Sequence, residues 1–263
     1  MHHVIKEITS QANPSVKRWK TLLTGRGIAK NNLAIVSGKR IVTEVVASHY
    51  ELVQSCLISS QTGEVLPELP AGVKIYRLAG QIFREIDCFG TGFPLLIVRR
   101  QEIEPFPSFG VRTPLILLVP FQDPSNLGAV IRSAAAFGVT NIVLLAEAAS
   151  PYHPKSIRAS GGAVFNVRFY RGPSIREVDI PGVPIVGLSK DGVPLESYTF
   201  PNQCALLPGI EGPGLPDLPG IRDTVAIPMS PGVESLNAAV ATSIALYAWR
   251  LKRKGRSRPA RSR

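Results

Sequence analysis

Short, continuous runs of apolar residues recur along the second half of the chain, between glycines and prolines. After Pro114 they read LILLVP, NIVLLA, AVFNVRF, PIVGLS, CALLPG and TVAIPM. Such runs are typical of parallel strands, because helices cover both faces of a parallel sheet. Between the first two runs, DPSNLGAVIRSAAAFG has the composition of a helix that ends at Gly138. The pattern predicts an α/β domain with a parallel sheet over residues 113–250, which closes with a C-terminal helix.

The first hundred residues show a second, smaller alternation. Val16, Trp19, Leu22 and Leu23 stand at roughly helical spacing. LAIVSGKRIVTEVVAS then combines an apolar strand, a glycine turn and a periodic helix, and ELVQSCLIS, VKIYRLA and FPLLIVRR follow as strands. We expect a compact α/β unit over residues 1–100. The segment 101–112, which is rich in proline, is the expected linker to the larger domain.

The chain is strongly basic, with a formal net charge of +11 and an isoelectric point near 9.9. Seven of the basic residues lie in LKRKGRSRPARSR, residues 251–263, which contains no acid and is predicted to be disordered. This charge favours a polyanionic partner, and we expect the tail to contact RNA phosphates rather than only to keep the protein soluble. Charge alone leaves RNA, DNA and an anionic membrane surface open as partners.

Several classes of protein are disfavoured by what the sequence lacks. It has no run of about 18 apolar residues for a transmembrane helix, and its polar N-terminus lacks the apolar centre of a signal peptide. Its 3 cysteines have unrelated spacings, and its histidines show no metal-ligand spacing. Leu33 and Asp217 interrupt the two glycine-rich phosphate patterns, which disfavours a nucleotide-dependent enzyme. We expect a cytoplasmic protein with no metal site and no membrane partner.

Three stretches place polar residues directly after predicted strands, where open α/β sheets bind ligands. The first, FQDPSNLGAVIRSAAAFGV, has Asn126 near the helix start and Arg132 further along it. At about 3.6 residues per turn, Arg132 would lie roughly 240° around an unbroken helix from Asn126, so the two converge only if Asn126 belongs to the loop. Taken alone, this stretch is better explained as a helix cap with a solvated arginine.

The other two stretches are also loops after strands. LLPGIEGPGLPD supplies Glu211 on a turn whose glycines would let a ligand touch the backbone. VAIPMSPGVESLNAAVA supplies Met229, Ser235 and Asn237, with Ser235 as the candidate cap of the last helix. A tight turn at a sheet edge and a helix cap are the structural alternatives. The three loops contain neither histidine nor cysteine, which argues against a hydrolytic triad.

In order and spacing, these three stretches resemble the motifs of the SpoU/TrmH family of RNA ribose 2′-O-methyltransferases, in the SPOUT superfamily. RASGGAVFNVRF is similar to the family's Ser-x-Gly-Ala segment, and SGKRIVTEVVA to the opening of its substrate-binding domain, with Ser37 where glutamate is usual. The resemblance implies an α/β fold: a SPOUT-type parallel sheet with a C-terminal trefoil knot, plus a smaller, ribosomal-protein-like N-terminal α/β domain that binds RNA. Knots are essentially absent from other proteins, so periodicity could not predict one.

The resemblance also implies S-adenosylmethionine as the cofactor, bound by the knotted loops. The matching cofactor positions are Leu207, Gly209, Ile210, Ile227, Met229, Leu236 and Asn237. Ile210 stands where serine or asparagine is commoner, so one polar contact is lost while backbone contacts remain. The family works as a homodimer through its C-terminal helices. Ala238, Ala241 and Ala245 have a spacing that allows close helix approach, although they could equally face the chain's own sheet.

The catalytic positions that the resemblance implies are Asn126, Arg132, Glu211, Ser235 and Asn237. The reaction moves a methyl group to a ribose 2′-oxygen, and Arg132 has been viewed in this family as the base. Because an arginine keeps its proton at neutral pH, we expect Arg132 to stabilise the developing alkoxide instead, oriented by Asn126, with Glu211 pairing with the cations. Ribosomal RNA is the expected substrate. The alternatives are transfer RNA and a catalytically silent RNA-binding protein with the same fold.

Overall fold

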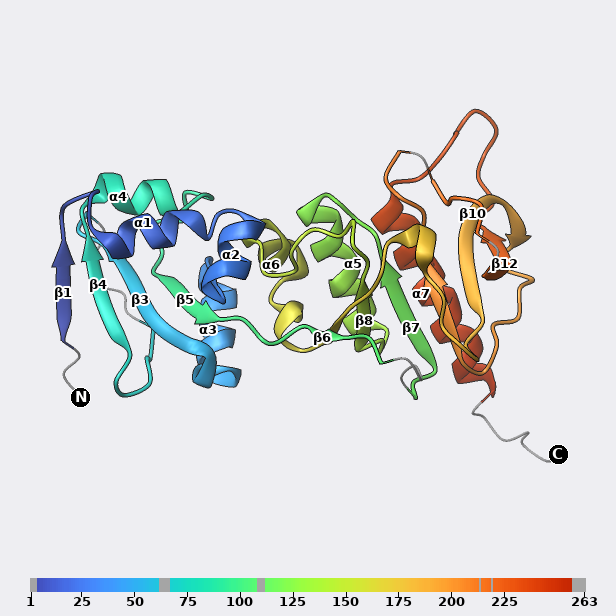
Figure 1. Ribbon diagram of the computed structural model, residues 1–263, viewed down its shortest axis with the longest axis horizontal. Helices are drawn as coiled ribbons and strands as arrows, with labels where there is room; N and C mark the ends of the chain where they lie inside the picture. Colours follow the sequence, from blue (N-terminus) through green and yellow to red (C-terminus); the bar gives the residue numbers. More distant parts are fainter. Residues whose placement is uncertain (1–3, 62–66, 108–111, 213, 219, 257–263) are drawn as a thin grey trace. The chain divides into compact units, whose positions relative to one another are not determined.

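The structure is a computed structural model that describes residues 4–61, 67–107, 112–212, 214–218 and 220–256. The chain divides into two compact units (Figure 1). Unit 1 comprises Met1–Gln101 and Ser150–Phe165, and unit 2 comprises Glu102–Ala149 and Asn166–Arg263. Among the described residues, no helix combines the length and the apolar character that crossing a bilayer requires.

The sheet of unit 1 has the strand order β1-β4-β3-β5-β2. Its strands are β1 (Ile5–Ile8), β2 (Leu33–Val36), β3 (Val53–Ser59), β4 (Lys74–Leu78) and β5 (Leu95–Arg99). β1, β4 and β3 run parallel, whereas β5 is antiparallel to both β3 and β2. The strands β2 to β5 confirm the strands that the apolar runs of the sequence predicted. β1 escapes prediction because IKEI is only four residues long and has two adjacent charged residues between its isoleucines.

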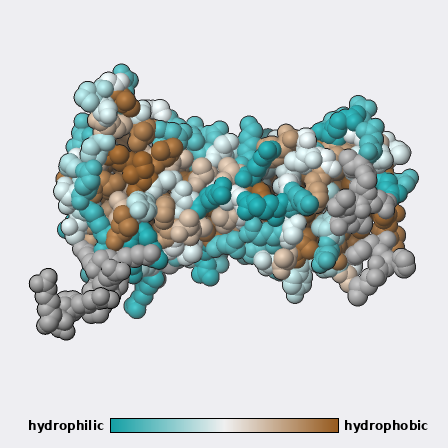
Figure 2. All heavy atoms as spheres, turned by 180° about the vertical axis from the view of Figure 1, so that it is seen from behind, coloured by the Kyte–Doolittle hydropathy of each residue, from teal (hydrophilic) through white to brown (hydrophobic). Residues whose placement is uncertain are grey.

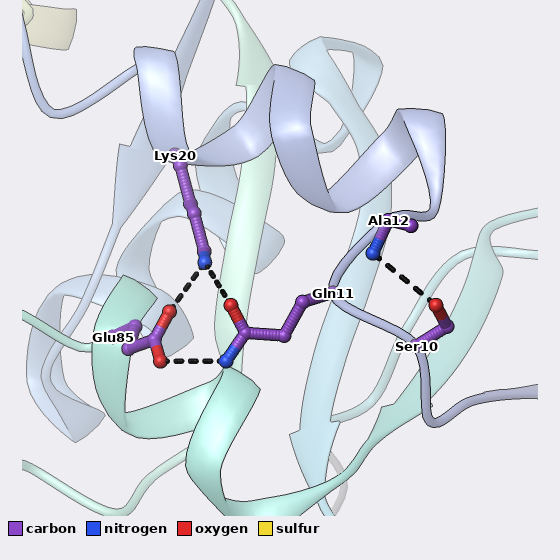
Figure 3. Close-up of polar contacts among 5 residues, drawn as sticks. All are labelled: Ser10, Gln11, Ala12, Lys20 and Glu85. Carbon is purple, nitrogen blue, oxygen red and sulfur yellow. Dashed lines mark hydrogen bonds and ion pairs between the residues drawn. The ribbon is translucent and has the colours of Figure 1, made fainter.

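A polar network joins two helices of unit 1 (Figure 3). Lys20, in α1 (Pro14–Thr21), forms an ion pair with Glu85 in α4 (Gly80–Ile86). Lys20 Nζ also donates to Gln11 Oε1 over 2.9 Å, and Gln11 Nε2 donates to Glu85 Oε1 over 2.8 Å. The hydrogen bonds from Lys20 and Gln11 lower the pKa of Glu85 below its ordinary value. Two further helices of this unit are α2 (Gly25–Asn31) and α3 (Lys39–Ser48).

The segment Ser150–Phe165 follows a strand of unit 2 in sequence but packs within unit 1. Its helix α6 (Pro154–Ser160) contacts β2, and Tyr152 and Phe165 are buried beside each other with ring centroids 6.2 Å apart. Arg40 Nη2, from α3, donates to the Gly161 carbonyl over 3.2 Å. The predicted domain over residues 113–250 is therefore not contiguous, because α6 packs on β2 and Arg40 bonds to Gly161, so that Ser150–Phe165 belongs to unit 1.

The sheet of unit 2 has the order β12-β10-β11-β7-β8-β9-β6. Its strands are β6 (Glu104–Pro105), β7 (Leu115–Val119), β8 (Asn141–Leu144), β9 (Arg168–Arg171), β10 (Ile185–Pro194), β11 (Cys204–Leu207) and β12 (Ile221–Ala226). The recorded pairings of these strands are all parallel within the described chain, which confirms the predicted parallel sheet. The short strand β6 lies in the segment expected to be a linker, and it extends the sheet beside β9.

The two faces of the unit 2 sheet are covered differently. Alternate residues of β7, Ile116 and Leu118, join a buried cluster with Ile175, Val178 and Ile180, which lie in and after the short 3₁₀ helix Ile175–Glu177. α5 (Pro124–Ala136) and α7 (Ala238–Arg256) pack against each other, with Ser243 and Ser133 hydroxyls 2.7 Å apart. The first face is thus covered by an irregular segment with one 3₁₀ turn where the apolar runs predicted a covering helix.

Helix α7 is longer than the sequence predicts. It continues to Arg256, into the segment 251–263 that was expected to be disordered, and residues 257–263 lie outside the described residues. Lysine and arginine are good helix formers, and cations are favourable near a helix C-terminus. Ala245 is fully buried within its own chain, whereas Ala238 and Ala241 are half-buried. Ala245 therefore faces the interior of the chain rather than offering a surface for a second helix.

Candidate active site

Three strands of unit 2 bring the predicted site residues to one edge of the sheet. β7 pairs with β11, and β10 pairs with both β11 and β12, all in parallel. The carboxyl ends of parallel strands lie at the same edge, which is where open α/β sheets bind ligands. The loops after β7, β11 and β12 contain the positions predicted from the sequence.

The loop after β7 leads into α5 through a cap at Asp123. Its Oδ1 accepts hydrogen bonds from the backbone amides of Ser125 and Asn126, at 2.7 and 2.9 Å, and Pro124 occupies the first helical position. Asn126 therefore lies in the first turn of the helix and not in the loop. Convergence with Arg132 was expected only with Asn126 in the loop, and it stays a prediction, since no hydrogen bond between the two is recorded among the described residues.

Glu211 lies on the loop after β11 and connects it to the start of α5. Asn126 Nδ2 donates to Glu211 Oε1 over 2.5 Å. Glu211 Oε2 accepts from the backbone amides of Gln122 and Asp123, at 3.2 and 3.0 Å. The described residues include no ion pair of Glu211, so the expected pairing with cations is replaced by three N–H donors. Sequence reasoning missed Gln122 and Asp123 as partners, because a backbone amide leaves no signal in side-chain identity.

Asn237 connects the third loop to the same place. Its Nδ2 donates to Asn126 Oδ1 over 3.1 Å, and its Oδ1 accepts from the backbone amides of Ala239 and Val240, at 3.0 and 3.2 Å. Asn237 is thus the cap of α7, and the prediction that Ser235 caps this helix is wrong. The helix starts two residues later than expected, and asparagine is as good a cap as serine. Asn126 and Asn237, two carboxamides, with the carboxylate of Glu211 bound to Asn126, are called the carboxamide cluster below.

Arg132 and Ser235 are placed outside the carboxamide cluster. Arg132 lies on α5 with an exposed side chain, and Ser235 lies on the exposed loop before α7. Within the described part of the chain, neither side chain has a recorded hydrogen bond or ion pair. Asn126 uses its amide oxygen and nitrogen on Asn237 and Glu211, and no bond from Arg132 to Asn126 is recorded among the described residues. Arg132 presents a positive charge to solvent on the helix that begins at the cluster.

The turn after β11 brings two backbone segments into close contact. Ile210 and Gly214 exchange backbone hydrogen bonds of 2.8 and 2.9 Å. A Cβ on Gly209 would stand 2.3 Å from the Gly214 carbonyl carbon and 2.4 Å from the Leu215 nitrogen, so no other residue fits without a shift of the backbone. Leu207, at the end of β11, is buried. The turn is therefore shaped by backbone alone, as a cradle for a ligand requires.

The remaining predicted cofactor positions line the loop after β12. Ile227 and Met229 are half-buried, and Leu236 is 36% exposed. These three apolar side chains lie on the loop whose last residue, Asn237, belongs to the carboxamide cluster and bonds to Asn126. No group of three or more histidine, cysteine, aspartate or glutamate side chains among the described residues could hold a metal ion. The site thus combines backbone edges, apolar side chains and amides.

Comparison with known proteins identifies the family. A model of the SpoU rRNA Methylase family matches residues 114–247. The chain is 43% identical over 251 residues to "Ribosomal RNA small subunit methyltransferase G 2" of Syntrophobacter fumaroxidans, which aligns 94% of this chain and 49% of the relative. It is 29% identical over 250 residues to the 23S rRNA (guanosine(2553)-2′-O)-methyltransferase RlmP of Bacillus subtilis, with 92% and 98% aligned. The chain therefore spans about half the length of the first relative.

A solved structure shows a similar arrangement. The crystal structure of an AdoMet-bound rRNA methyltransferase from Sinorhizobium meliloti superposes with a TM-score of 0.74 at 25% identity, over 94% of this chain and 98% of that one. The parallel sheet defines an open α/β fold, and the carboxamide cluster lies at its carboxyl edge, where such folds bind ligands. The protein belongs to the SpoU rRNA Methylase family.

Proposed function

We propose that this protein is a methyltransferase that uses S-adenosylmethionine to methylate a ribose 2′-hydroxyl in ribosomal RNA. The carboxamide cluster carries this proposal, because it ties the loops after β7, β11 and β12 into one site inside the span matched by the family. The relative RlmP is named for a 2′-O-methylation of 23S rRNA, and it aligns along 98% of its length. The absence of a histidine or cysteine from these loops agrees with a transfer that needs no nucleophilic side chain.

The residues around the carboxyl edge suit the proposed cofactor. Polar parts of a ligand would meet the backbone of the turn after Leu207, whose shape is fixed by the Ile210–Gly214 hydrogen bonds and by the close approach of Gly209 to Gly214. The apolar side chains of Ile227, Met229 and Leu236 would cover its flat ring, and Asn237 would fix the loop that carries them. S-adenosylmethionine supplies the methyl group when it is bound there.

Arg132 would act on the substrate as a fixed positive charge. Its guanidinium is exposed on α5 and keeps its proton at neutral pH, so it would stabilise the negative charge that grows on the ribose oxygen. The proton would leave by another route. Asn126 and Glu211 would hold the loops at the spacing that the reaction needs, since their polar atoms bind one another and the backbone. Ser235, exposed on the third loop, would face the substrate.

The decisive experiment compares 2′-O-methyl positions in ribosomal and transfer RNA from cells with and without this protein. We expect one or more ribosomal positions to lose the methyl group when the protein is absent. Loss of the methyl group at a transfer RNA position instead would identify transfer RNA as the substrate. Loss at no position, together with no binding of S-adenosylmethionine, would leave only the silent RNA-binding protein.

A substitution at Arg132 tests the role of its guanidinium. Arg132→Lys keeps one positive charge but loses the planar fork, so we expect kcat to fall about 100-fold while RNA affinity stays near that of the unaltered protein. Arg176→Lys, at another exposed arginine of unit 2, is the matched control. Near-native turnover of Arg132→Lys with normal RNA affinity contradicts the proposed role.

We also propose a homodimer that forms through α7. Val240, Ile244, Tyr247 and Leu251 repeat at helical spacing and are 48%, 37%, 51% and 51% exposed. Figure 2 shows hydrophobic surface gathered on the half of the molecule that carries the C-terminal residues. Ile244→Glu should convert a dimer to a monomer in analytical ultracentrifugation, whereas Val193→Glu, at an exposed position on β10, should not. A monomeric native protein contradicts this part of the proposal.

Three further properties belong to the proposal. We propose that the C-terminal segment of unit 2 is threaded as a trefoil knot, as the resemblance to the SpoU/TrmH family implies. An electron-density trace through residues 204–245 tests it, and an unthreaded path contradicts it. We also propose that the protein works in the cytoplasm, which agrees with its free thiols at Cys56, Cys88 and Cys204, and that unit 1 with the basic residues after Arg250 binds the RNA substrate.

A further inference from the structure

A tightly held loop of unit 1 presents an aromatic ring beside cations. The loop follows α4 and leads into β5. Asp87, only 5% exposed, accepts hydrogen bonds from the Thr91 hydroxyl at 3.2 Å and from the Gly92 amide at 2.8 Å. Gly90 and Gly92 have positive φ angles of 60° and 62°, which favour glycine. The turn is thereby fixed, and Phe89 lies half-buried within it.

The guanidinium of Arg158 lies over the ring of Phe89. Its central carbon is 4.3 Å from the ring centroid, within the range of a cation–π contact. Arg158 comes from α6, in the segment Ser150–Phe165 that packs in unit 1, and its side chain is exposed. A planar guanidinium held against a ring on one side leaves its other side open to a second flat group.

Further cations share this edge of the unit 1 sheet. β2 is antiparallel to β5, with Val36 opposite Leu96, so the end of β2 lies beside the start of β5. Lys39 and Arg40 follow the end of β2, and Arg40 donates to the Gly161 carbonyl just after α6. Lys155 is exposed on α6 itself. Glu44, 3.7 Å from Arg40, is the nearby acid that offsets part of this charge.

The electrostatics of Cys88 agree with the position of two of these cations near the loop. Burial is the largest cause of the raised pKa of the Cys88 thiol, and the charge of Asp87 adds to it. The positive charges of Arg158 and Lys155 act in the opposite direction and lower that pKa. The positive charges of both cations therefore act on the loop that carries Phe89.

We propose that Arg158, in cation–π contact with Phe89, is a stacking platform for one unpaired base of the RNA substrate, and that Lys155, Lys39 and Arg40 contact the adjoining phosphates. This inference rests on the proposed RNA methyltransferase function and adds the place where unit 1 holds the RNA. Bases of an RNA duplex are hidden in the stack, whereas unpaired bases stack on arginine planes and aromatic rings. Phe89 is a positioning residue in this arrangement, because it acts through Arg158.

The test measures binding of the full-length protein to a short single-stranded RNA and to the same strand without its bases. Arg158→Lys keeps the charge and loses the plane. It should weaken binding of the intact RNA about tenfold and leave binding of the abasic strand unchanged. Phe89→Leu should give the same pattern, because the guanidinium is no longer held flat. Arg158→Ala should weaken both strands, since a charge is also lost.

Arg99 provides a matched control. It is exposed at the far end of β5, at the opposite edge of the same sheet, and Arg99→Lys should change neither strand. Methylation assays with ribosomal RNA separate this inference from the proposed function. Here Arg158→Lys and Phe89→Leu should raise KM for RNA rather than lower kcat, whereas a merely structural defect would reduce the amount of folded, cofactor-binding protein.

Three outcomes overturn the platform. They are no binding of the single-stranded RNA by the unaltered protein, equal weakening of intact and abasic strands by Arg158→Lys, and binding by Arg158→Lys within twofold of the unaltered protein. If the unaltered protein shows the base-dependent binding but methylates no RNA, the platform stands as a binding site and the proposed enzymatic function fails instead.

Discussion

The carboxyl ends of strands in the two units carry opposite kinds of polar surface. In unit 2, the side chains of Asn126, Glu211 and Asn237 bind one another and the backbone, so they are fixed before any ligand arrives. In unit 1, Lys39 and Arg158 extend exposed charges at the comparable edge. A satisfied polar network suits a reaction that needs fixed geometry, whereas exposed cations suit a flexible polyanion. Under the proposed function, the sheet of unit 2 would position the reacting groups, and the sheet of unit 1 would bind the RNA.

The largest expected effect comes from the turn of unit 2. Gly209→Ala would place a Cβ 2.3 Å from the Gly214 carbonyl carbon, and backbone cannot yield as a side-chain tip can. We expect S-adenosylmethionine affinity to fall about 100-fold, or about 2.7 kcal/mol, as measured by calorimetry. Gly220→Ala is the control, since its Cβ would meet only an ordinary contact of 3.6 Å. RNA affinity should not change, so loss of both activities would break the separation between the units.

The converse substitution affects unit 1. Gly27→Ala would place a Cβ 1.9 Å from the Thr21 carbonyl oxygen between α1 and α2, and we expect a loss of about 3 kcal/mol in stability. RNA binding should fall at temperatures where S-adenosylmethionine binding persists. Gly25→Ala, on the same helix, meets only a Cβ at 3.8 Å and should behave like the native protein. Simultaneous unfolding of both units in calorimetry would contradict their independence.

A smaller effect distinguishes the two roles of Asn237. Asn237→Ala removes the cap of α7 and the bond to Asn126, and we expect a loss of about 1 kcal/mol in the free energy of unfolding, measured in urea. Asn237→Asp keeps a capping acceptor but cannot donate to Asn126. It should therefore recover stability while methyl transfer stays impaired. Full recovery of both by Asn237→Asp would show that the bond to Asn126 is dispensable.

The smallest effect is the pH dependence of the network between α1 and α4. The pKa of Glu85 is lowered in the folded state, chiefly by its hydrogen bond to Lys20. The stabilisation is therefore complete above the ordinary glutamate pKa and is lost as pH falls through the lowered value. Glu85→Gln should remove this acid-side slope in urea unfolding curves, and Glu51→Gln, at an exposed position, should retain it. An unchanged slope in Glu85→Gln would assign it to other carboxyl groups.

Most strands could be predicted because each is an apolar run bounded by glycine or proline. The exceptions have physical causes. β1 and β6 are short and partly charged, and they are strands only because a neighbouring edge offers hydrogen bonds. The order of the motifs along the chain predicted a contiguous second domain. The segment Ser150–Phe165, in which Tyr152 and Phe165 are buried, instead packs within unit 1.

The candidate site was only partly predictable for a different reason. The sequence motifs identify Asn126, Glu211 and Asn237, and the structure brings these three together. Their partners are set by distances between loops, and a one-dimensional pattern does not contain those distances. Arg132 shows the limit of this prediction. Its expected contact with Asn126 depends on where the helix begins, and the cap at Asp123 makes Pro124 the first helical residue.

The placement of Ser150–Phe165 has a consequence for how this chain is made. Unit 1 needs a piece that is synthesised only after the first strands of unit 2 have appeared. During translation, β2 would wait without α6 until residue 165 has left the ribosomal exit tunnel, and a cut after Gln101 would release an incomplete first unit. The order of synthesis thus interleaves the two units. A single cut in the chain therefore cannot separate one complete unit from the other.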